Sequence, residues 1–306
     1  MEGIEDKFDQ RSAIQDRLDD DDLLPLEAKK LFFEKPPGSA DELYIDPLGG
    51  KEPEAPELLR TEFLGMNFHN AVLAELLDSL SSNIGAARFR YAVTPNVDHL
   101  VTIARSAIGS DIRVAYDEAD YLVCDSRVLS LMARKSRVEL PAVPGSDITA
   151  ALLARLEDGT SIAAVGGSPV VHEELRARYP QFEWSFFIPP MGVLHSEEAQ
   201  DAICQFVATT DADISFIAIG APQSEVVCRK IKAAGNARGL ALCIGASLEF
   251  ITGEKTRAPL WVQKAHCEWL FRLLQEPHRL AYRYLIKGPT IFLAWARWSR
   301  SRRGVA

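Results

Sequence analysis

The sequence lacks the cysteine patterns of disulfide-rich and zinc-binding proteins. Its five cysteines are scattered along 306 residues, and no two of them form a CxxC pair. An odd, scattered set of thiols favours reduced cysteines in a cytosolic protein. Residues 1–30 are acidic and contain no continuous apolar core, so we expect no secretory signal peptide. No run of about 18 apolar residues occurs, which argues against a membrane-spanning helix.

Several signatures of nucleotide binding and catalysis are also missing. The chain contains neither a GxGxxG fingerprint nor a P-loop, which argues against a dinucleotide-dependent oxidoreductase and a P-loop NTPase. It contains no GxSxG nucleophile elbow, as found in α/β-hydrolases. Its six histidines form no HExxH or similar pair, so we predict no metal site.

Charge is distributed unevenly along the chain. The net charge is −9; residues 1–60 carry 17 acidic and 8 basic side chains, whereas residues 251–306 carry 3 acidic and 11 basic ones. The acidic total argues against nucleic acid as a partner. The basic C-terminal end predicts one surface directed at an anionic partner.

Composition divides the chain into three predicted regions. Residues 1–60 are acidic, rich in proline and glycine and weakly periodic, so we expect a flexible extension. Between 61 and 260, short apolar runs alternate with helical patterns. This alternation predicts a doubly wound α/β domain, with a mainly parallel sheet and helices on both faces. Residues 261–306 are predicted to form a helical, basic appendage.

The appendage ends in PTIFLAWARWSRSRRGVA, which mixes tryptophan and arginine. A short cationic helix that carries tryptophan suits the interface of an anionic membrane. Docking of the helix against the domain and packing in a homo-oligomer are the alternative interpretations.

Six apolar runs are the expected strands: ARFRYAVTPN, DYLVCDS, TSIAAVGGS, EWSFFIPPMG, ADISFIAIGAP and LALCIGAS. Ligands of open α/β sheets bind outside the carboxyl ends of the strands. Glycine there lets backbone N–H groups approach a ligand, and the following helix N-terminus favours an anion. The candidate binding glycines are therefore Gly166, Gly167, Gly220 and Gly245.

Polar residues at these strand ends leave alternatives open. Asp125 follows the apolar run YLVC and could be the N-cap of the next helix or a catalytic or ligand-binding carboxylate. His99 could orient a loop or contact a ligand. Ser146 or Asp147 could cap the helix that follows PGSDI.

Seven segments occur in order across about 90–285: TPNVDHL, PGSDI, PPMG, IGAPQSE, GASLEFITG, RAP and EWLFRLLQEPHRLAYRYL. Together they resemble the WecG/TagA/CpsF family of glycosyltransferases. The resemblance implies transfer of a sugar (HexNAc, such as N-acetylmannosamine, hexose or uronic acid) from a UDP-sugar to a polyprenyl-diphosphate-linked sugar. It implies inversion, no cofactor, no obligatory metal, and work at the cytoplasmic face of a bacterial membrane. The products would enter teichoic acid, exopolysaccharide or related surface polymers.

The resemblance also implies roles for single residues. Thr94, as a catalytic residue, and Asn96, as a binding residue, are expected near the transferred sugar. Asp125 is expected to be the general base; the family usually has Asp-Gly at this position, and this chain has Asp125-Ser126. Gln223 corresponds to the glutamine of a GAPxQE-like motif, although this chain reads APQSE instead of the more usual PKQE. Glu249 corresponds to an acidic residue that contacts the nucleoside. Three arginines in and directly after the EWLxR and EPxR motifs are expected to bind diphosphate: Arg272, Arg279 and Arg283.

A different class of function is the alternative. The Asp-Ser departure and the long acidic extension would also suit a non-catalytic protein that binds a nucleotide sugar, or a scaffold protein, in a polysaccharide-synthesis complex.

Overall fold

The computed structural model describes residues 58–303, except 108, 260 and 263–267. The predicted flexible extension therefore lies almost entirely outside the described residues and stays a prediction. The predicted boundary between a domain and an appendage near residue 260 also stays a prediction.

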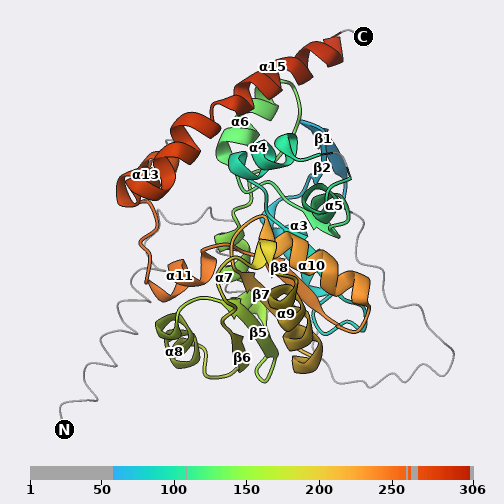
Figure 1. The fold of residues 1–306 in the computed structure, drawn as a ribbon, viewed down its shortest axis with the longest axis vertical. Helices are drawn as coiled ribbons and strands as arrows, with labels where there is room; N and C mark the ends of the chain where they lie inside the picture. The colour runs from blue at the N-terminus through green and yellow to red at the C-terminus, as the bar shows by residue number, and fades with distance from the viewer. Residues whose placement is uncertain (1–57, 108, 260, 263–267, 304–306) are drawn as a thin grey trace, which may run out of the picture. The chain divides into compact units, whose positions relative to one another are not determined.

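Six parallel strands form the central sheet, in the order β4-β3-β8-β7-β5-β6 (Figure 1). Each predicted apolar run supplies one strand, since each run is bounded by residues that end a strand. The strands are β3 (Arg90–Val93), β4 (Tyr121–Leu122), β5 (Ser161–Gly166), β6 (Glu183–Phe187), β7 (Ile214–Ala218) and β8 (Leu240–Cys243). A separate antiparallel hairpin joins β1 (Arg60–Phe63) to β2 (Met66–His69). The predicted α/β fold class is confirmed.

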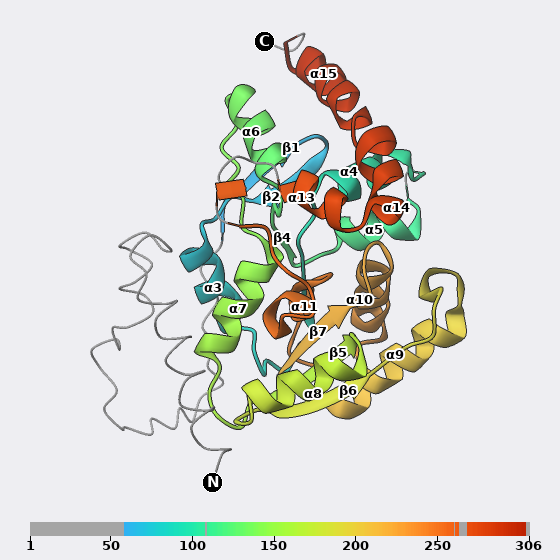
Figure 2. The same ribbon diagram turned by 90° about the vertical axis from the view of Figure 1, so that its left-hand side faces the viewer.

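Helices cover both faces of the sheet (Figures 1 and 2). One face packs against α3 (Leu73–Ser81), α7 (Gly145–Arg155), α8 (Pro169–Arg178) and α11 (Ser247–Thr252). The other face packs against α4 (Val97–Arg105), α5 (Asp111–Asp117), α6 (Arg127–Lys135), α9 (Glu197–Thr210) and α10 (Gln223–Ala234).

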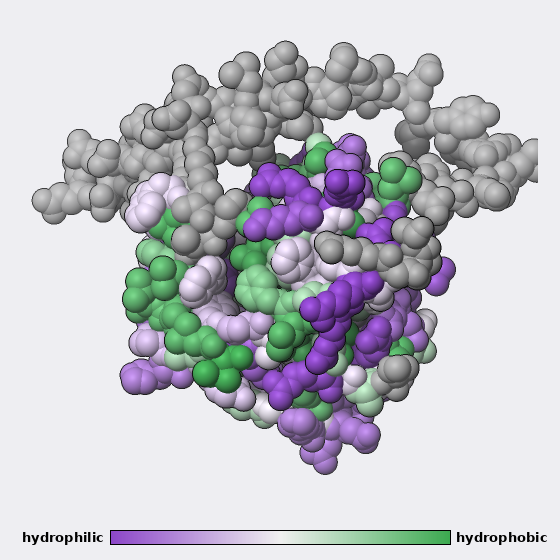
Figure 3. Space-filling view, turned by 90° about the horizontal axis from the view of Figure 1, so that it is seen from above, coloured by the Kyte–Doolittle hydropathy of each residue, from purple (hydrophilic) through white to green (hydrophobic). Residues whose placement is uncertain are grey.

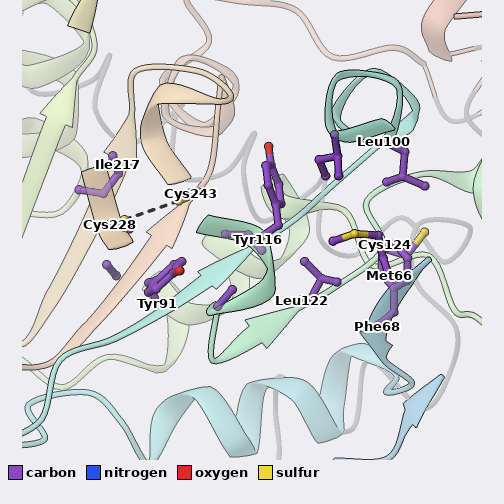
Figure 4. Close-up of a cluster of buried hydrophobic side chains, with 14 of the residues drawn as sticks. Met66, Phe68, Tyr91, Leu100, Tyr116, Leu122, Cys124, Ile217, Cys228 and Cys243 are labelled. Carbon is purple, nitrogen blue, oxygen red and sulfur yellow. Dashed lines mark hydrogen bonds between the residues drawn. The ribbon is translucent and has the colours of Figure 1, made fainter. Parts of the chain in front are cut away.

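The sheet has a hydrophobic core on each face, because successive side chains of a strand point to opposite faces. Tyr91 and Val93 enter the core on the α10 face, whereas Ala92 between them enters the core on the α7 face. Figure 4 shows part of the first core, where Tyr91 and Tyr116 lie among aliphatic and sulfur-bearing side chains. The Tyr91 hydroxyl donates a hydrogen bond of 2.6 Å to the carbonyl of Ala115, so this buried polar atom is satisfied.

The C-terminal helices lie alongside α4 in both ribbon views (Figures 1 and 2). They comprise α13 (Glu268–Gln275), α14 (Pro277–Ala281), the π-helical turn η2 (Tyr282–Lys287) and α15 (Thr290–Arg303). None of the helices within the described residues is long and apolar enough to cross a membrane.

Both tryptophans of α15 contact the α/β part of the molecule. Trp295 donates a hydrogen bond of 2.7 Å to the Ser136 hydroxyl, and Trp298 donates one of 2.9 Å to the Glu62 carboxylate. Trp298 also packs edge to face on Phe63. In the structure, α15 therefore docks against the α/β part of the molecule, which was one of the alternative interpretations of this tail.

Other apolar side chains of the C-terminal helices stay exposed. Leu285, Ile286, Phe292 and Leu293 are each more than half exposed. Seen from above, hydrophobic and hydrophilic side chains lie side by side on the face of the molecule toward which α15 rises (Figure 3).

Candidate active site

A cavity of about 580 Å³ opens at the carboxyl ends of β3, β4 and β8. The strand ends, the first turns of α4 and α6 and the start of α7 form one side, and the C-terminal helices form the other. This is the position at which open α/β sheets bind ligands. Six of the predicted site residues line it: Thr94, Asn96, Asp125, Gly245, Arg272 and Arg283.

Asp125 is not the N-cap of the helix that follows it. Ser126 takes that position, because its hydroxyl accepts a hydrogen bond of 3.3 Å from the backbone N–H of Leu129. The Asp125 N–H donates to the Pro95 carbonyl at 3.1 Å, which fixes the loop after β4 against the end of β3. The Asp125 carboxylate accepts a hydrogen bond of 3.1 Å from the N–H of Gly145, the first residue of α7.

The environment of Asp125 suits a general base. Burial raises the pKa of its carboxyl from 3.8 to about 7, although the positive charge of Arg272 and the Gly145 hydrogen bond partly oppose this shift. Glu268 and Asp147 raise the pKa further because they are negatively charged. A base with a pKa near the working pH combines a populated ionised form with a useful proton affinity.

Thr94 and Gly145 approach each other closely beside Asp125. The Thr94 hydroxyl donates to the Cys243 carbonyl at 3.3 Å, which ties the ends of β3 and β8 together. A side chain on Gly145 would place its Cβ 3.0 Å from the Thr94 oxygen, so glycine allows α7 to begin here. Asn96 caps α4 by accepting a 3.0 Å hydrogen bond from the N–H of Asp98.

Two of the cationic side chains that line the cavity lie against α11: Arg272 of α13 and Lys255, which follows α11. The Arg272 guanidinium lies over the ring of Phe250, 5.0 Å from its centroid, and its positive charge lowers the pKa of Asp125. Lys255 pairs with Glu249 at 3.1 Å and lies 3.8 Å from Glu276. Lys255 was not predicted from the sequence, although it directly follows the segment GASLEFITGE.

A second group of ionisable side chains lies where α4, α10 and η2 line the cavity. Arg283 pairs with Asp98, and His99 lies 3.9 Å from Glu225 and 3.3 Å from the Tyr116 hydroxyl. Burial lowers the pKa of His99 to about 4, so its imidazole is neutral at pH 7. Asp98, His99 and Glu225 line the cavity; sequence reasoning considered His99 and missed the two carboxylates.

Asp147 does not cap α7, and neither does Ser146. Helix α7 begins at Gly145 without a side-chain cap, and Asp147 pairs with Arg257 at 2.5 Å.

The remaining predicted binding residues are not among the described residues that line this cavity. The side chain of Gln223 donates a hydrogen bond to the Ile219 carbonyl. Glu249 forms an ion pair with Lys255, and Lys255 lines the cavity. Gly166 has a positive φ of 96°, and a Cβ there would lie 2.7 Å from the Ala218 carbonyl, so the close approach of β5 and β7 requires glycine. Gly167 and Gly220 also have positive φ and lie at strand ends. Arg279 belongs to α14, and its side chain lies outside the described residues.

Within the described part of the chain, no group of three or more His, Cys, Asp or Glu side chains could hold a metal ion.

Comparison with protein families agrees with this geometry. The family model described as "Glycosyl transferase WecG/TagA/CpsF family" matches residues 61–304, which include every element that lines the cavity. The chain belongs to this family. It is therefore a glycosyltransferase of a family that works in cell-surface polysaccharide synthesis.

Proposed function

We propose that this protein transfers a HexNAc, hexose or uronic acid residue from a UDP-sugar to a polyprenyl-diphosphate-linked sugar, with inversion and without a metal. The observation that carries the proposal is the position of Asp125. Its carboxyl group lies in the cavity with a pKa of about 7, and the positive charge of Arg272 acts on it. These are the two groups that a metal-independent transfer needs, one for the proton and one for the leaving group.

The proposed reaction is a single displacement. The ionised Asp125 carboxylate takes the proton from an acceptor hydroxyl as that oxygen attacks the anomeric carbon. The bond from the anomeric carbon to the UDP oxygen breaks on the opposite face, so the configuration inverts. Asp125 then passes its proton to water after the products leave.

Negative charge that develops on the UDP diphosphate needs cationic partners. Arg272 and Lys255 are the candidates, because both line the cavity and both contact α11, Arg272 at Phe250 and Lys255 at Glu249. A guanidinium group binds diphosphate oxygens through two parallel hydrogen bonds, and its charge shortens and strengthens them. The ring of Phe250 would hold that guanidinium plane in place.

Release of UDP from a panel of UDP-sugars tests this function. The acceptors are detergent-dispersed polyprenyl-diphosphate sugars, and each pair is measured with magnesium and with a chelator. We expect acceptor-dependent release from one class of donor, at the same rate in both conditions. UDP binding without release from any pair would instead favour the scaffold function.

The acceptor lipid places the protein at the inner face of the cell membrane in this proposal. Phe292 and Leu293 are exposed on α15, and Arg297, Arg300 and Arg302 follow them on the same helix. Apolar side chains beside cations suit an anionic bilayer surface.

Vesicle sedimentation tests this membrane contact. The paired substitution Phe292→Ser and Leu293→Ser should weaken binding to anionic vesicles severalfold. Val170→Ser is the matched control, because Val170 is an exposed apolar residue on the distant helix α8. Equal binding by the double variant and the control would contradict a role for α15.

A further inference from the structure

Glu225 is a buried carboxylate that the proposed transfer step does not use. It lies in the first turn of α10, is 1% exposed, and lines the cavity. Its Oε2 atom has no hydrogen-bond partner among the described residues. A buried carboxylate oxygen without a partner costs stability, and a ligand that donates a hydrogen bond to it would remove that cost.

The neighbours of Glu225 do not neutralise it. The imidazole of His99 lies beside it, with Nδ1 3.9 Å from Oε1, and burial lowers the pKa of His99 to about 4. Burial raises the pKa of Glu225 itself to about 7, while its own backbone N–H and the Tyr116 hydroxyl partly oppose the shift. The carboxyl group is thus available as an acceptor at and above neutral pH.

Asp98 supplies a second acceptor at the same end of the cavity. It adjoins His99 in α4, and its Oδ2 atom pairs with Arg283. Its Oδ1 atom is buried and, like Glu225 Oε2, has no partner among the described residues. A carboxylate that pairs with a guanidinium group offers its second oxygen as a hydrogen-bond acceptor.

We infer that Glu225 and Asp98 bind hydroxyl groups of a pyranose ring. This inference rests on the proposed function and assigns a part of the same cavity. Carboxylates repel a diphosphate, which leaves the phosphates to Arg272 and Lys255, whereas sugar hydroxyls donate to carboxylate oxygens.

The hydroxyl groups can come from the donor sugar or from the acceptor sugar. Both present the same chemistry, and steady-state kinetics of Glu225→Gln separates them. Because a hydrogen bond to a charged group is strong, the KM of the sugar that Glu225 contacts should rise about tenfold or more. A raised donor KM assigns the donor sugar, and a raised acceptor KM assigns the acceptor sugar. Both values within twofold of wild type would overturn the inference.

Deoxy sugars give a second, independent measurement. Wild-type protein should lose about tenfold in kcat/KM for the deoxy analogue that lacks the contacted hydroxyl. Glu225→Gln should show no further loss with that analogue, because the contact is already absent. Additive losses for every deoxy analogue would contradict a direct contact.

Glu198→Gln is the matched control, since Glu198 lies in the first turn of α9 and is exposed. Its KM values should equal those of wild type. If wild-type protein releases no UDP from any pair, the proposed function fails, and Glu225 is tested by calorimetry alone. Equal affinity of wild type and Glu225→Gln for both UDP-sugar and lipid-linked sugar would then overturn the inference.

Discussion

The two ends of the central sheet place an aspartate in opposite surroundings. At the amino end, Asp213 precedes β7 and accepts hydrogen bonds from the N–H and hydroxyl of Ser161 at 2.9 and 2.7 Å. It also pairs with Arg238 at 2.9 Å. Burial acts to raise the pKa of Asp213, but these bonds and the arginine hold it below 3.8. At the carboxyl end, Asp125 accepts one backbone hydrogen bond, and burial raises its pKa to about 7.

The difference separates a structural carboxylate from a reactive one. Asp213 is ionised and satisfied, and it joins the starts of β5 and β7. At the opposite end, Asp125 is partly buried and Glu225 is fully buried, and this burial raises the pKa of both carboxyl groups, so their ionised forms cost stability. Strongly shifted carboxyls in a cleft mark a functional site, and proteins commonly accept this loss of stability there.

The largest expected effect is on turnover. Asp125→Asn should lower kcat/KM for UDP release by about 100-fold or more, because the variant has no general base. Asp213→Asn should retain the wild-type kcat/KM per folded molecule, since Asp213 lies at the far end of the sheet. A similar loss of kcat/KM in both variants would contradict the different roles assigned to Asp125 and Asp213.

Arg272 should have the next largest effect. Arg272→Gln should lower kcat/KM for the donor by about tenfold or more, since it removes a charge-assisted contact to diphosphate. The pH profile should also move to higher pH, because Arg272 lowers the pKa of Asp125. Arg229→Gln is the control, as Arg229 pairs with Asp111 and Glu118 outside the cavity. An unshifted profile would contradict the coupling of Arg272 to Asp125.

Stability should respond in opposite directions at the two ends. Asp213→Asn should lower the free energy of unfolding by about 2 kcal/mol at pH 8, because hydrogen bonds to a charged group are lost. Asp125→Asn should raise it by about 1 kcal/mol or more. The native state holds the Asp125 proton more tightly, so the wild type loses stability as the pH rises from about 4 to about 7. Denaturant titration at pH 4, 6 and 8 measures both effects, and a destabilised Asp125→Asn at pH 8 would contradict the assignment.

The smallest effect concerns two serine caps. Ser126→Ala and Ser196→Ala should each lower the free energy of unfolding by about 1 kcal/mol, since each removes a helix N-cap. Only Ser126→Ala should also lower turnover, because Ser126 adjoins Asp125. Thermal melts and UDP release separate the two outcomes, and equal turnover would show that the cap does not position the base.

The fold was largely readable from the sequence. Each strand is a short apolar run bounded by glycine, proline, asparagine or aspartate, and that signal is local. The docking of Trp295 and Trp298 was not readable, because an amphipathic helix has the same pattern on a membrane and on a protein surface.

The site was predicted in part. Asp125 and Ser126 can both accept a hydrogen bond from the following helix, and only the backbone geometry decides that Ser126 is the cap. Helix α10 begins at Gln223, so Ser224 and Glu225 line the cavity while Gln223 turns back to Ile219. A helix start is uncertain by one or two residues in a sequence, and that error changes which side chain meets a ligand.

The pH dependence of UDP release tests the role of Asp125 most directly. With saturating acceptor, wild-type kcat/KM for the donor should rise with pH through an apparent pKa of about 7 and then level off, because the ionised carboxylate is the base. Asp125→Asn should lack this rise and stay about 100-fold or more below the plateau. An Asp125→Asn variant that keeps the wild-type rate and the same rise would show that Asp125 is not the base.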